Sequence, residues 1–343
     1  MRQRNRTTAK CMMYDLSEDN IGAEEREHNK DTSVLVTGGS GYLGSILVEM
    51  LVNRGFKTTV VDNLQYGQNT LFNLFNRDNF DFIYGDVTNE ALIKNLLAKN
   101  SYDFILPLAA IVGYPVSEDK PELTWDVNYR AIATMLKHRK KGSKIIFPTT
   151  NSGYGTTTGE VECTEESPLN PISTYGRSKV AAEKDIMDSG NAIALRLATL
   201  FGFSQRMRVD LLVNDFVFKA FTEKTIVLYE RKFKRNFLHV RDASRAFIWC
   251  MYNWEKMGDN IYNLGHPDYN ITKEELVGYI KKQVPNLGVF YSEADHDPDK
   301  RNYIISNDKI LSTGYKCKYS LEFGISELLK GYRAFRDFRF KNY

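Results

Sequence analysis

The sequence predicts an α/β fold in which a doubly wound parallel sheet is joined to a smaller C-terminal α/β lobe. An apolar run at residues 34–36 leads into three glycines spaced G-x-x-G-x-x-G, and apolar residues at helical spacing follow. Further apolar runs at 58–61, 82–84, 104–108 and 144–148 alternate with helical stretches, as in βαβ units. The 343 residues are 42% hydrophobic, which suffices for one large domain or two closely joined ones.

Composition excludes several classes of partner. The net charge is only +3 and no long basic run alternates with aromatics, so we expect no nucleic-acid partner. No apolar segment approaches the ~18 residues of a membrane span, and the first residues lack a signal-peptide core. We therefore expect a cytoplasmic protein with no membrane partner. The four cysteines are Cys11, Cys163, Cys250 and Cys317. They form no C-x-x-C pair, so the sequence predicts neither a metal site nor a disulfide framework.

The chain divides by composition into a tail and two lobes. Residues 1–32 carry basic and then acidic groups with few apolar positions, which predicts a flexible tail. We assign residues 33–200 and 237–265 to the larger, Rossmann-type domain, and residues 201–236 and 266–335 to the smaller lobe. In the smaller lobe, Thr272 is the expected N-cap of a helix that begins at Lys273.

The glycine stretch, VLVTGGSGYLG, predicts a dinucleotide site. Gly38, Gly41 and Gly44 let the backbone approach a pyrophosphate, whose charge the N-terminus of the next helix offsets. Glycines at this spacing also mark ordinary turns, so the context decides. The second strand ends in Asp62, where a carboxylate can accept hydrogen bonds from a ribose and repels a 2′-phosphate. NAD is therefore favoured over NADP.

Two further strand ends have the composition of a cofactor site. Asp86 follows the third strand, where it can bond an adenine amino group or, alternatively, cap the next helix. Ala109 and Ala110 follow the fourth strand and are small enough for a cofactor to lie against the backbone.

Hydroxyl groups gather at the end of the fifth strand and precede a Tyr/Lys pair. Thr149, Thr150 and Ser152 lie at the strand's carboxyl end, the edge where open α/β sheets bind ligands. Tyr175 and Lys179 are four positions apart, so on a helix they share one face. An ammonium favours the phenolate, which can then take a proton from a sugar or alcohol hydroxyl as hydride leaves for nicotinamide. An interface tyrosine beside a solvated lysine is the alternative for this spacing alone.

In combination these residues resemble the extended branch of the short-chain dehydrogenase/reductase superfamily, the nucleotide-sugar epimerases and dehydratases. The likeness rests on TGGSGYLG, Asp62, Gly85-Asp86, LAA at 108–110, Asn128, Thr150 with Tyr154-Gly155, Y-x-x-x-K, and FLHVRD at 237–242. It implies that Thr150, Tyr175 and Lys179 are catalytic. It implies that NAD contacts Gly38, Gly41, Tyr42, Leu43, Gly44, Asp62, Asn63, Asp86, Val87, Leu108, Ala109, Ala110, Asn128, Tyr175 and Lys179.

The same resemblance implies where a sugar nucleotide binds. Asn214, Arg235 and Arg301 correspond to residues near the diphosphate, which a planar guanidinium can meet in pairs. Arg206 and Arg208 are additional candidates, although in such a charged stretch a solvated face is the favoured interpretation for at least one of them. Thr199 departs from the family, in which Asn is frequent near the diphosphate.

A second departure narrows the reaction. Dehydratases of this family have acidic residues directly after the catalytic threonine, where this chain has Asn151 and Ser152, which we expect to contact the substrate. An amide and a hydroxyl are poor general acids or bases near pH 7, so loss of water is disfavoured. Oxidation at C4 remains, by a 4-dehydrogenase or a 4-epimerase. TNSGYG with RMRVDLLVNDF also resembles the C4 dehydrogenases of GDP-heptoses in capsule polysaccharide biosynthesis.

Two other interpretations stay open, a 4,6-dehydratase and an NAD-binding regulatory or structural protein without activity.

Members of the family commonly pair through the helix bearing Y-x-x-x-K. Val180, Ala181 and Ala182 are small enough for close helix packing, so we expect a homodimer or a tetramer of such dimers.

Overall fold

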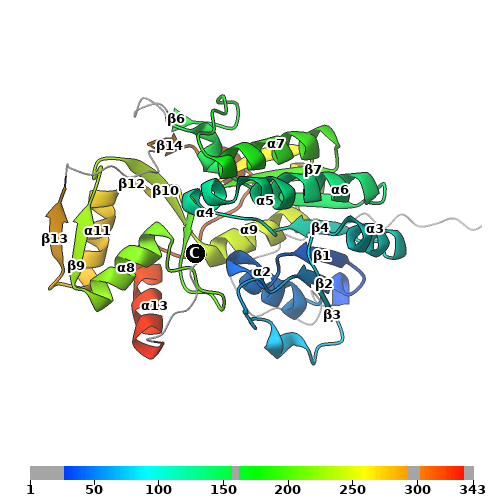
Figure 1. Cartoon of the computed structure of the whole chain (residues 1–343), viewed down its shortest axis with the longest axis horizontal. Coiled ribbons are helices and arrows are strands. Elements are labelled where there is room, and N and C mark those ends of the chain that lie inside the picture. The colour runs from blue at the N-terminus through cyan, green and yellow to red at the C-terminus, as the bar shows by residue number, and fades with distance from the viewer. Residues whose placement is uncertain (1–26, 157–161, 293–301, 336–343) are drawn as a thin grey trace, which may run out of the picture.

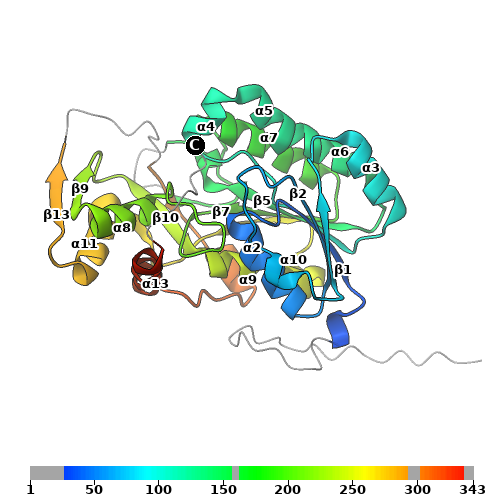
Figure 2. The same ribbon diagram turned by 60° about the horizontal axis from the view of Figure 1, so that its bottom comes forward.

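The protein has a large sheet sandwiched between helices and a smaller lobe beside it. The computed structural model describes residues 27–156, 162–292 and 302–335. Figures 1 and 2 show the smaller lobe, with α8, α11 and α13, next to the layered lobe that contains α2 to α7. Within the described residues, no helix is long and apolar enough to cross a membrane.

The large sheet confirms the predicted doubly wound arrangement. All seven strands are parallel, and β1 lies between β2 and β4, so the chain turns to opposite sides of β1. From edge to edge the strands are β11 (Asn260–Leu264), β7 (Ala192–Leu197), β5 (Lys144–Thr150), β4 (Phe104–Pro107), β1 (Ser33–Thr37), β2 (Lys57–Asp62) and β3 (Phe80–Tyr84).

Alternating side chains of the strands build two cores. In β1, Val34 and Val36 point to one face and Leu35 to the other, and all three are fully buried. One face packs on α2 (Tyr42–Asn53), α9 (Val240–Tyr252) and α10 (Trp254–Met257). The other packs on α3 (Glu90–Lys99), α6 (Ala131–His138) and α7 (Thr174–Asp188), with α4 (Tyr114–Asp119) and α5 (Pro121–Trp125) beside α7. A short π-helix, η2 (Asp126–Arg130), joins α5 to α6.

The smaller lobe has its own sheets and its own core. Its three-stranded sheet consists of β12 (Asn270–Thr272), β10 (Lys234–His239) and β8 (Thr199–Phe201), and β9 (Thr225–Leu228) pairs with β13 (Gly288–Tyr291). Helices α8 (Leu212–Thr222), α11 (Lys273–Gln283) and α13 (Leu321–Ala334) cover the core. The predicted cap of α11 is confirmed, because Thr272 and Glu275 form a capping box. The short elements are η1 (Phe72–Leu74), η3 (Asn151–Tyr154), β6 (Glu162–Cys163), β14 (Ile304–Ile305) and α12 (Asp308–Ser312).

The chain crosses between the lobes more than once, and residues 237–239 belong to β10 of the smaller sheet while α9 and β11 pack in the layered lobe. The predicted segment 237–265 is therefore shared between the lobes.

Hydrogen bonds also join α2 to the start of the smaller lobe: the Tyr42 hydroxyl donates to the Gly202 carbonyl at 2.7 Å, and the Ser45 and Ser204 hydroxyls lie 3.0 Å apart.

Two expectations about the periphery need correction. The predicted flexible tail lies outside the described residues up to residue 26, but Asn29 is 2% exposed and donates hydrogen bonds to the Arg54 carbonyl and the Tyr252 hydroxyl. The end of the predicted tail, at Asn29, therefore packs on the body. Ala182, expected at a subunit interface, is fully buried inside the chain against the sheet.

Candidate active site

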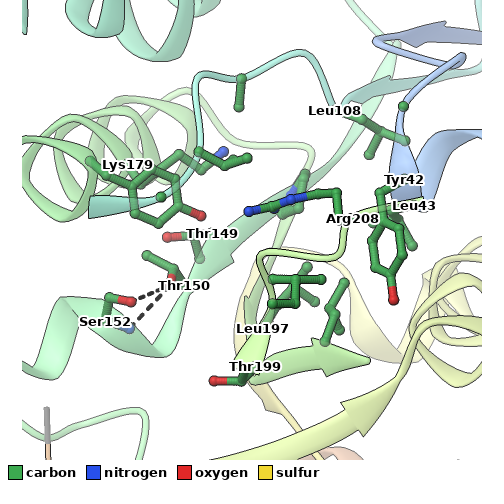
Figure 3. Close-up of a pocket in the computed structure, with 18 of the residues that line it drawn as sticks. Tyr42, Leu43, Leu108, Thr149, Thr150, Ser152, Lys179, Leu197, Thr199 and Arg208 are labelled. Atoms are coloured by element: carbon green, nitrogen blue, oxygen red, sulfur yellow. Dashed lines mark hydrogen bonds between the residues drawn. The ribbon is translucent and has the colours of Figure 1, made fainter. Parts of the chain in front are cut away.

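A pocket of about 260 Å³ lies at the carboxyl ends of β1, β4, β5 and β7, on the side facing the smaller lobe (Figure 3). This is the point where the strand order reverses, the usual ligand site of an open α/β sheet. The predicted residues that line it are Gly38, Gly41, Tyr42, Leu43, Gly44, Leu108, Ala110, Thr150, Ser152, Tyr175, Lys179, Arg206 and Arg208. The structure thus gathers residues from five separate stretches of sequence.

The glycine loop leaves no room for side chains. Gly38 has a φ of +71°, and a Cβ on it would lie 2.6 Å from the Ala109 nitrogen. A Cβ on Gly44 would lie 2.4 Å from the Gly38 carbonyl oxygen. Gly41 is the N-cap of α2, whose first turn opens on the pocket. The loop is therefore a close-fitting backbone cradle at a helix N-terminus, which fits the pyrophosphate of a dinucleotide.

Asp62 lies at the end of β2 and holds the glycine loop. Its carboxylate accepts hydrogen bonds from the Ser40 nitrogen at 2.9 Å and the Leu64 nitrogen at 2.8 Å. Burial raises the pKa of Asp62, and these two hydrogen bonds oppose the rise. Asp62 does not line the pocket, so its contact with a ribose stays a prediction.

Asp86 does not cap the next helix, so that alternative is wrong. Asn89 is the N-cap of α3, whereas Asp86 accepts hydrogen bonds from Asn63 Nδ2 at 2.8 Å and from the Thr88 nitrogen at 2.8 Å. Val87 is buried beside it. These residues lie outside the pocket lining, and the predicted adenine contact remains untested.

Asn128, on η2, fixes the loop that follows β4. Its side chain pairs with both backbone groups of Ile111, at 2.8 and 3.0 Å, and also donates to the Ser178 hydroxyl on α7. Asn128 thus positions the loop and α7 relative to one another without lining the pocket. Ala109 contacts the glycine loop through its backbone, while its neighbours Leu108 and Ala110 line the cavity.

The hydroxyls at the end of β5 form a small network. The Thr150 hydroxyl donates to the Ser152 hydroxyl at 2.9 Å and accepts from the Ser152 nitrogen. Through the second bond, Thr150 is the N-cap of η3. Thr149 also lines the pocket, and its buried hydroxyl has no hydrogen-bond partner in the described part of the chain. The sequence placed Thr149 at the strand end without giving it a role. Asn151 is 1% exposed and lies outside the lining.

Tyr175 and Lys179 lie one turn apart near the N-terminus of α7, and both line the pocket. The Ser173 side chain caps the helix, and Glu118 accepts a hydrogen bond from the Thr174 nitrogen. Lys179 is 3% exposed, and its Nζ lies 3.8 Å from the centroid of the Phe147 ring. Burial lowers the pKa of Lys179 to about 7, although Glu183 opposes this.

Glu183 follows Lys179 by one turn and belongs to a buried ion pair. Arg196 on β7 binds it with Nη2 at 2.6 Å and Nε at 3.1 Å, and both side chains are 4% exposed. Arg196 also donates to the Tyr154 hydroxyl at 2.8 Å. The pair ties the helix bearing Tyr175 to the sheet beneath it.

Two arginines enter the pocket from the segment after β8. The Arg206 guanidinium lies over the Tyr66 ring at 4.1 Å, and Arg208 forms an ion pair with Asp210. The Arg206 residue is 1% exposed and the Arg208 side chain 13%, so the solvated-face alternative is wrong for both. Tyr66 follows β2 in a polar turn, where nothing in the sequence indicated a pocket residue.

Two other predicted substrate residues, Asn214 and Arg235, lie outside the lining. Asn214 is fully buried, and its side chain bonds to the Gly202 nitrogen, the Tyr42 hydroxyl and the Arg208 carbonyl. Arg235 is 4% exposed on β10, and Arg301 lies outside the described residues. Their contacts with a substrate stay predictions.

Comparison with known proteins agrees with this geometry. The profile of the family described as "NAD dependent epimerase/dehydratase family" matches residues 34–265. UDP-glucuronic acid decarboxylase 2 of Arabidopsis thaliana is 30% identical over 89% of this chain and 69% of its own length. The solved UDP-glucose 4-epimerase of Thermotoga maritima, with UDP-glucose, superposes with a TM-score of 0.78 at 24% identity, over 88% of this chain and 99% of that one.

The solved dTDP-glucose 4,6-dehydratase of Bacillus anthracis, in complex with NAD, superposes with a TM-score of 0.75 at 24% identity, over 88% of this chain and 97% of that one. These structures share the fold, and the relatives include a decarboxylase, an epimerase and a dehydratase of sugar nucleotides. The family profile covers most of the chain, from the first strand of the large sheet to its last. The protein is a member of the NAD-dependent epimerase/dehydratase family.

Proposed function

We propose that the protein uses NAD to oxidise C4 of a nucleoside-diphosphate sugar, as a 4-dehydrogenase or a 4-epimerase. The proposal is supported by the convergence of the glycine loop, Thr150, Tyr175 and Lys179 on one pocket. In this proposal the glycine loop and the N-terminus of α2 hold the NAD pyrophosphate, Asp62 holds the adenosine ribose, and Lys179 holds the nicotinamide ribose. Bound NAD supplies the hydride acceptor.

Tyr175 is the proposed base that removes the proton from the C4 hydroxyl. Its phenol is a poor base at its ordinary pKa near 10, so nearby positive charge must stabilise the phenolate. Thr150 orients the same hydroxyl. To do so while Tyr175 takes the only proton of that hydroxyl, Thr150 must donate its own hydrogen to the C4 oxygen. In the structure this hydrogen is bonded to Ser152, so it turns to the substrate on binding, while the Ser152 nitrogen keeps its bond to the Thr150 oxygen.

The observation that best separates the possible reactions is the chemistry next to Thr150. The pocket wall there consists of a serine hydroxyl, and the adjacent Asn151 is an amide. Neither group readily expels a hydroxyl by protonating it near pH 7, so we propose chemistry at C4 without loss of water. A 4,6-dehydratase is the second candidate, in which another acid would have to serve.

We further propose that the sugar nucleotide lies between the large sheet and the smaller lobe, where Asn151, Ser152, Arg208, Asn214, Arg235 and Arg301 contribute to its binding. The likeness of TNSGYG and RMRVDLLVNDF to GDP-heptose dehydrogenases makes a GDP-linked heptose the first substrate to try. A homodimer through α7 is the proposed assembly, with Val180 and Ala181 half-buried on that helix.

The test is incubation of the NAD-loaded protein with UDP- and GDP-linked hexoses and a GDP-linked heptose, with the products analysed by mass and by proton NMR. A product lacking two hydrogens identifies a 4-dehydrogenase, and an unchanged mass with inverted C4 identifies a 4-epimerase. Loss of water would contradict the proposal. Tyr175→Phe should abolish turnover while NAD still binds; retained turnover would rule out Tyr175 as the base.

A further inference from the structure

Arg208 is placed across the pocket from the proposed base. It comes from the segment after β8, and its guanidinium extends over the cavity toward the side that holds Thr149, Thr150 and Lys179 (Figure 3). Its Nη2 lies 3.9 Å from the position that a Cβ on Gly113 would occupy. Gly113 and Tyr175 both line the pocket with it.

Neighbouring side chains hold both the backbone and the guanidinium of Arg208 in place. Asn214 Nδ2 donates to its carbonyl at 2.8 Å, and Asp210 pairs with its guanidinium. The Arg208 side chain is only 13% exposed, and Asp210 is 6% exposed. A cation fixed in this way acts at a defined place in the pocket, with little screening by water.

Lys179 alone is a weak source of positive charge near pH 7. Burial lowers the pKa of its ammonium to about 7, so it loses its charge as the pH rises through the neutral range. An arginine stays charged at every pH at which the protein is folded. Burial lowers the pKa of Arg208, but Asp210 and, more weakly, the charges of Tyr175 and Tyr42 outweigh it and raise the pKa. Because such coupling is reciprocal, Arg208 favours the Tyr175 phenolate in turn.

We propose that Arg208 is a positioning residue that stabilises the Tyr175 phenolate, as a second and permanent cation beside Lys179. The inference rests on the proposed role of Tyr175 as base. It adds to the proposed contact of Arg208 with substrate, because one guanidinium can face both the phenolate and the sugar nucleotide with its five donors. The charged and titratable groups around the pair are Asp210, Glu118, Glu183, Arg206, Lys179, Tyr42, Tyr66, Tyr114 and Tyr303.

Arg206 offers a matched control. It is a buried guanidinium two positions earlier on the same segment and it also lines the pocket, but it faces the Tyr66 ring. Asp210→Asn offers a change of opposite sign, because it removes the negative charge that partly neutralises Arg208. Arg208→Lys keeps the charge without the planar fork.

The experiment is a pH titration of the full-length, NAD-saturated protein labelled with ¹³C at the tyrosine ring carbon that bears the hydroxyl, with Tyr175→Phe identifying the signal. A nearby positive charge favours the ionised form of an acid and so lowers its pKa. Arg208→Gln should therefore raise the pKa of Tyr175 by more than a few tenths. Arg206→Gln should leave it within a few tenths, Asp210→Asn should lower it, and Arg208→Lys should restore most of the wild-type value.

An unchanged pKa of Tyr175 in Arg208→Gln, or an equal rise in Arg206→Gln, would overturn the inference. If Arg208→Gln does not fold, the direction of the change in Asp210→Asn decides. The titration needs no sugar nucleotide, so a protein that responds as expected but turns over none would refute the proposed function and leave the role of Arg208 intact. Where turnover is found, the acidic limb of its pH profile should move with the titration.

Discussion

Replacing Lys179 by Met should make the nucleotide-free protein more stable at neutral pH, even though Lys179 is a proposed catalytic residue. The ammonium is 3% exposed and lies over the Phe147 ring at 3.8 Å, so folding removes it from water. Burial lowers its pKa from 10.5 to about 7. Methionine fills a similar volume and has no charge to desolvate.

The sign and size of the effect follow from proton binding. Between pH 7 and 10.5 the unfolded chain binds a proton at Lys179 that the folded protein does not bind. The stability of the folded protein therefore falls as pH decreases through this window, by about 1.4 kcal/mol per pH unit. The loss is complete below pH 7, where it amounts to about 5 kcal/mol.

The assay is urea unfolding of the wild-type protein and Lys179→Met at steps between about pH 7 and about pH 10. The advantage of the methionine variant should shrink as pH rises, because the wild-type protein regains stability toward pH 10. Lys137→Met, at an exposed lysine of α6, controls for the loss of one lysine, and its curve should run parallel to that of the wild type. A Lys179→Met advantage that does not change with pH would refute the reasoning.

Three other predictions concern the glycine loop, the buried ion pair beneath α7 and the cap of α11. Gly44→Ala should abolish NAD binding, measured by fluorescence titration, because its Cβ would lie 2.4 Å from the Gly38 carbonyl oxygen; binding within twofold of wild type would contradict this. Arg196→Met should cost about 3–5 kcal/mol in urea unfolding by leaving Glu183 buried and unpaired, and adding Glu183→Gln should recover much of that loss. Thr272→Ala should cost about 1 kcal/mol, since it removes the capping box of α11; a change below experimental error would show that the cap is not needed.

The elements that carry the cofactor site could be predicted because their signals are local. The glycine loop, Asp62 and the Tyr175–Lys179 pair each combine a residue type with a short spacing, and their order along the chain excludes the alternatives that each spacing alone would allow. The parallel sheet followed from the alternation of apolar strands and helical stretches, and the structure confirms it.

The packing of the pocket wall could not be predicted, because its contacts join residues distant in sequence. Arg206 stacks on Tyr66, about 140 residues earlier, and nothing near Tyr66 marks it as a partner. SQRMRVD is charged and polar, so a solvated face was a reasonable alternative until packing between the lobes buried both arginines. Asp86 was ambiguous for a different, local reason: both Asp86 and Asn89 precede the helix, and Asn89 supplies the cap.

The bonds between α2 and the segment at 202–204 bear on the exchange of lobes between relatives. Tyr42 binds the Gly202 carbonyl, a backbone group that any donor sequence provides, whereas Ser45 needs a hydroxyl at Ser204. Asn214 in turn bonds to the Tyr42 hydroxyl at 3.2 Å. A chimera that takes its smaller lobe from another family member thus needs matching side chains at positions 204 and 214, as well as apolar residues that pack on Tyr42 and Ile46, to seat against the cofactor helix.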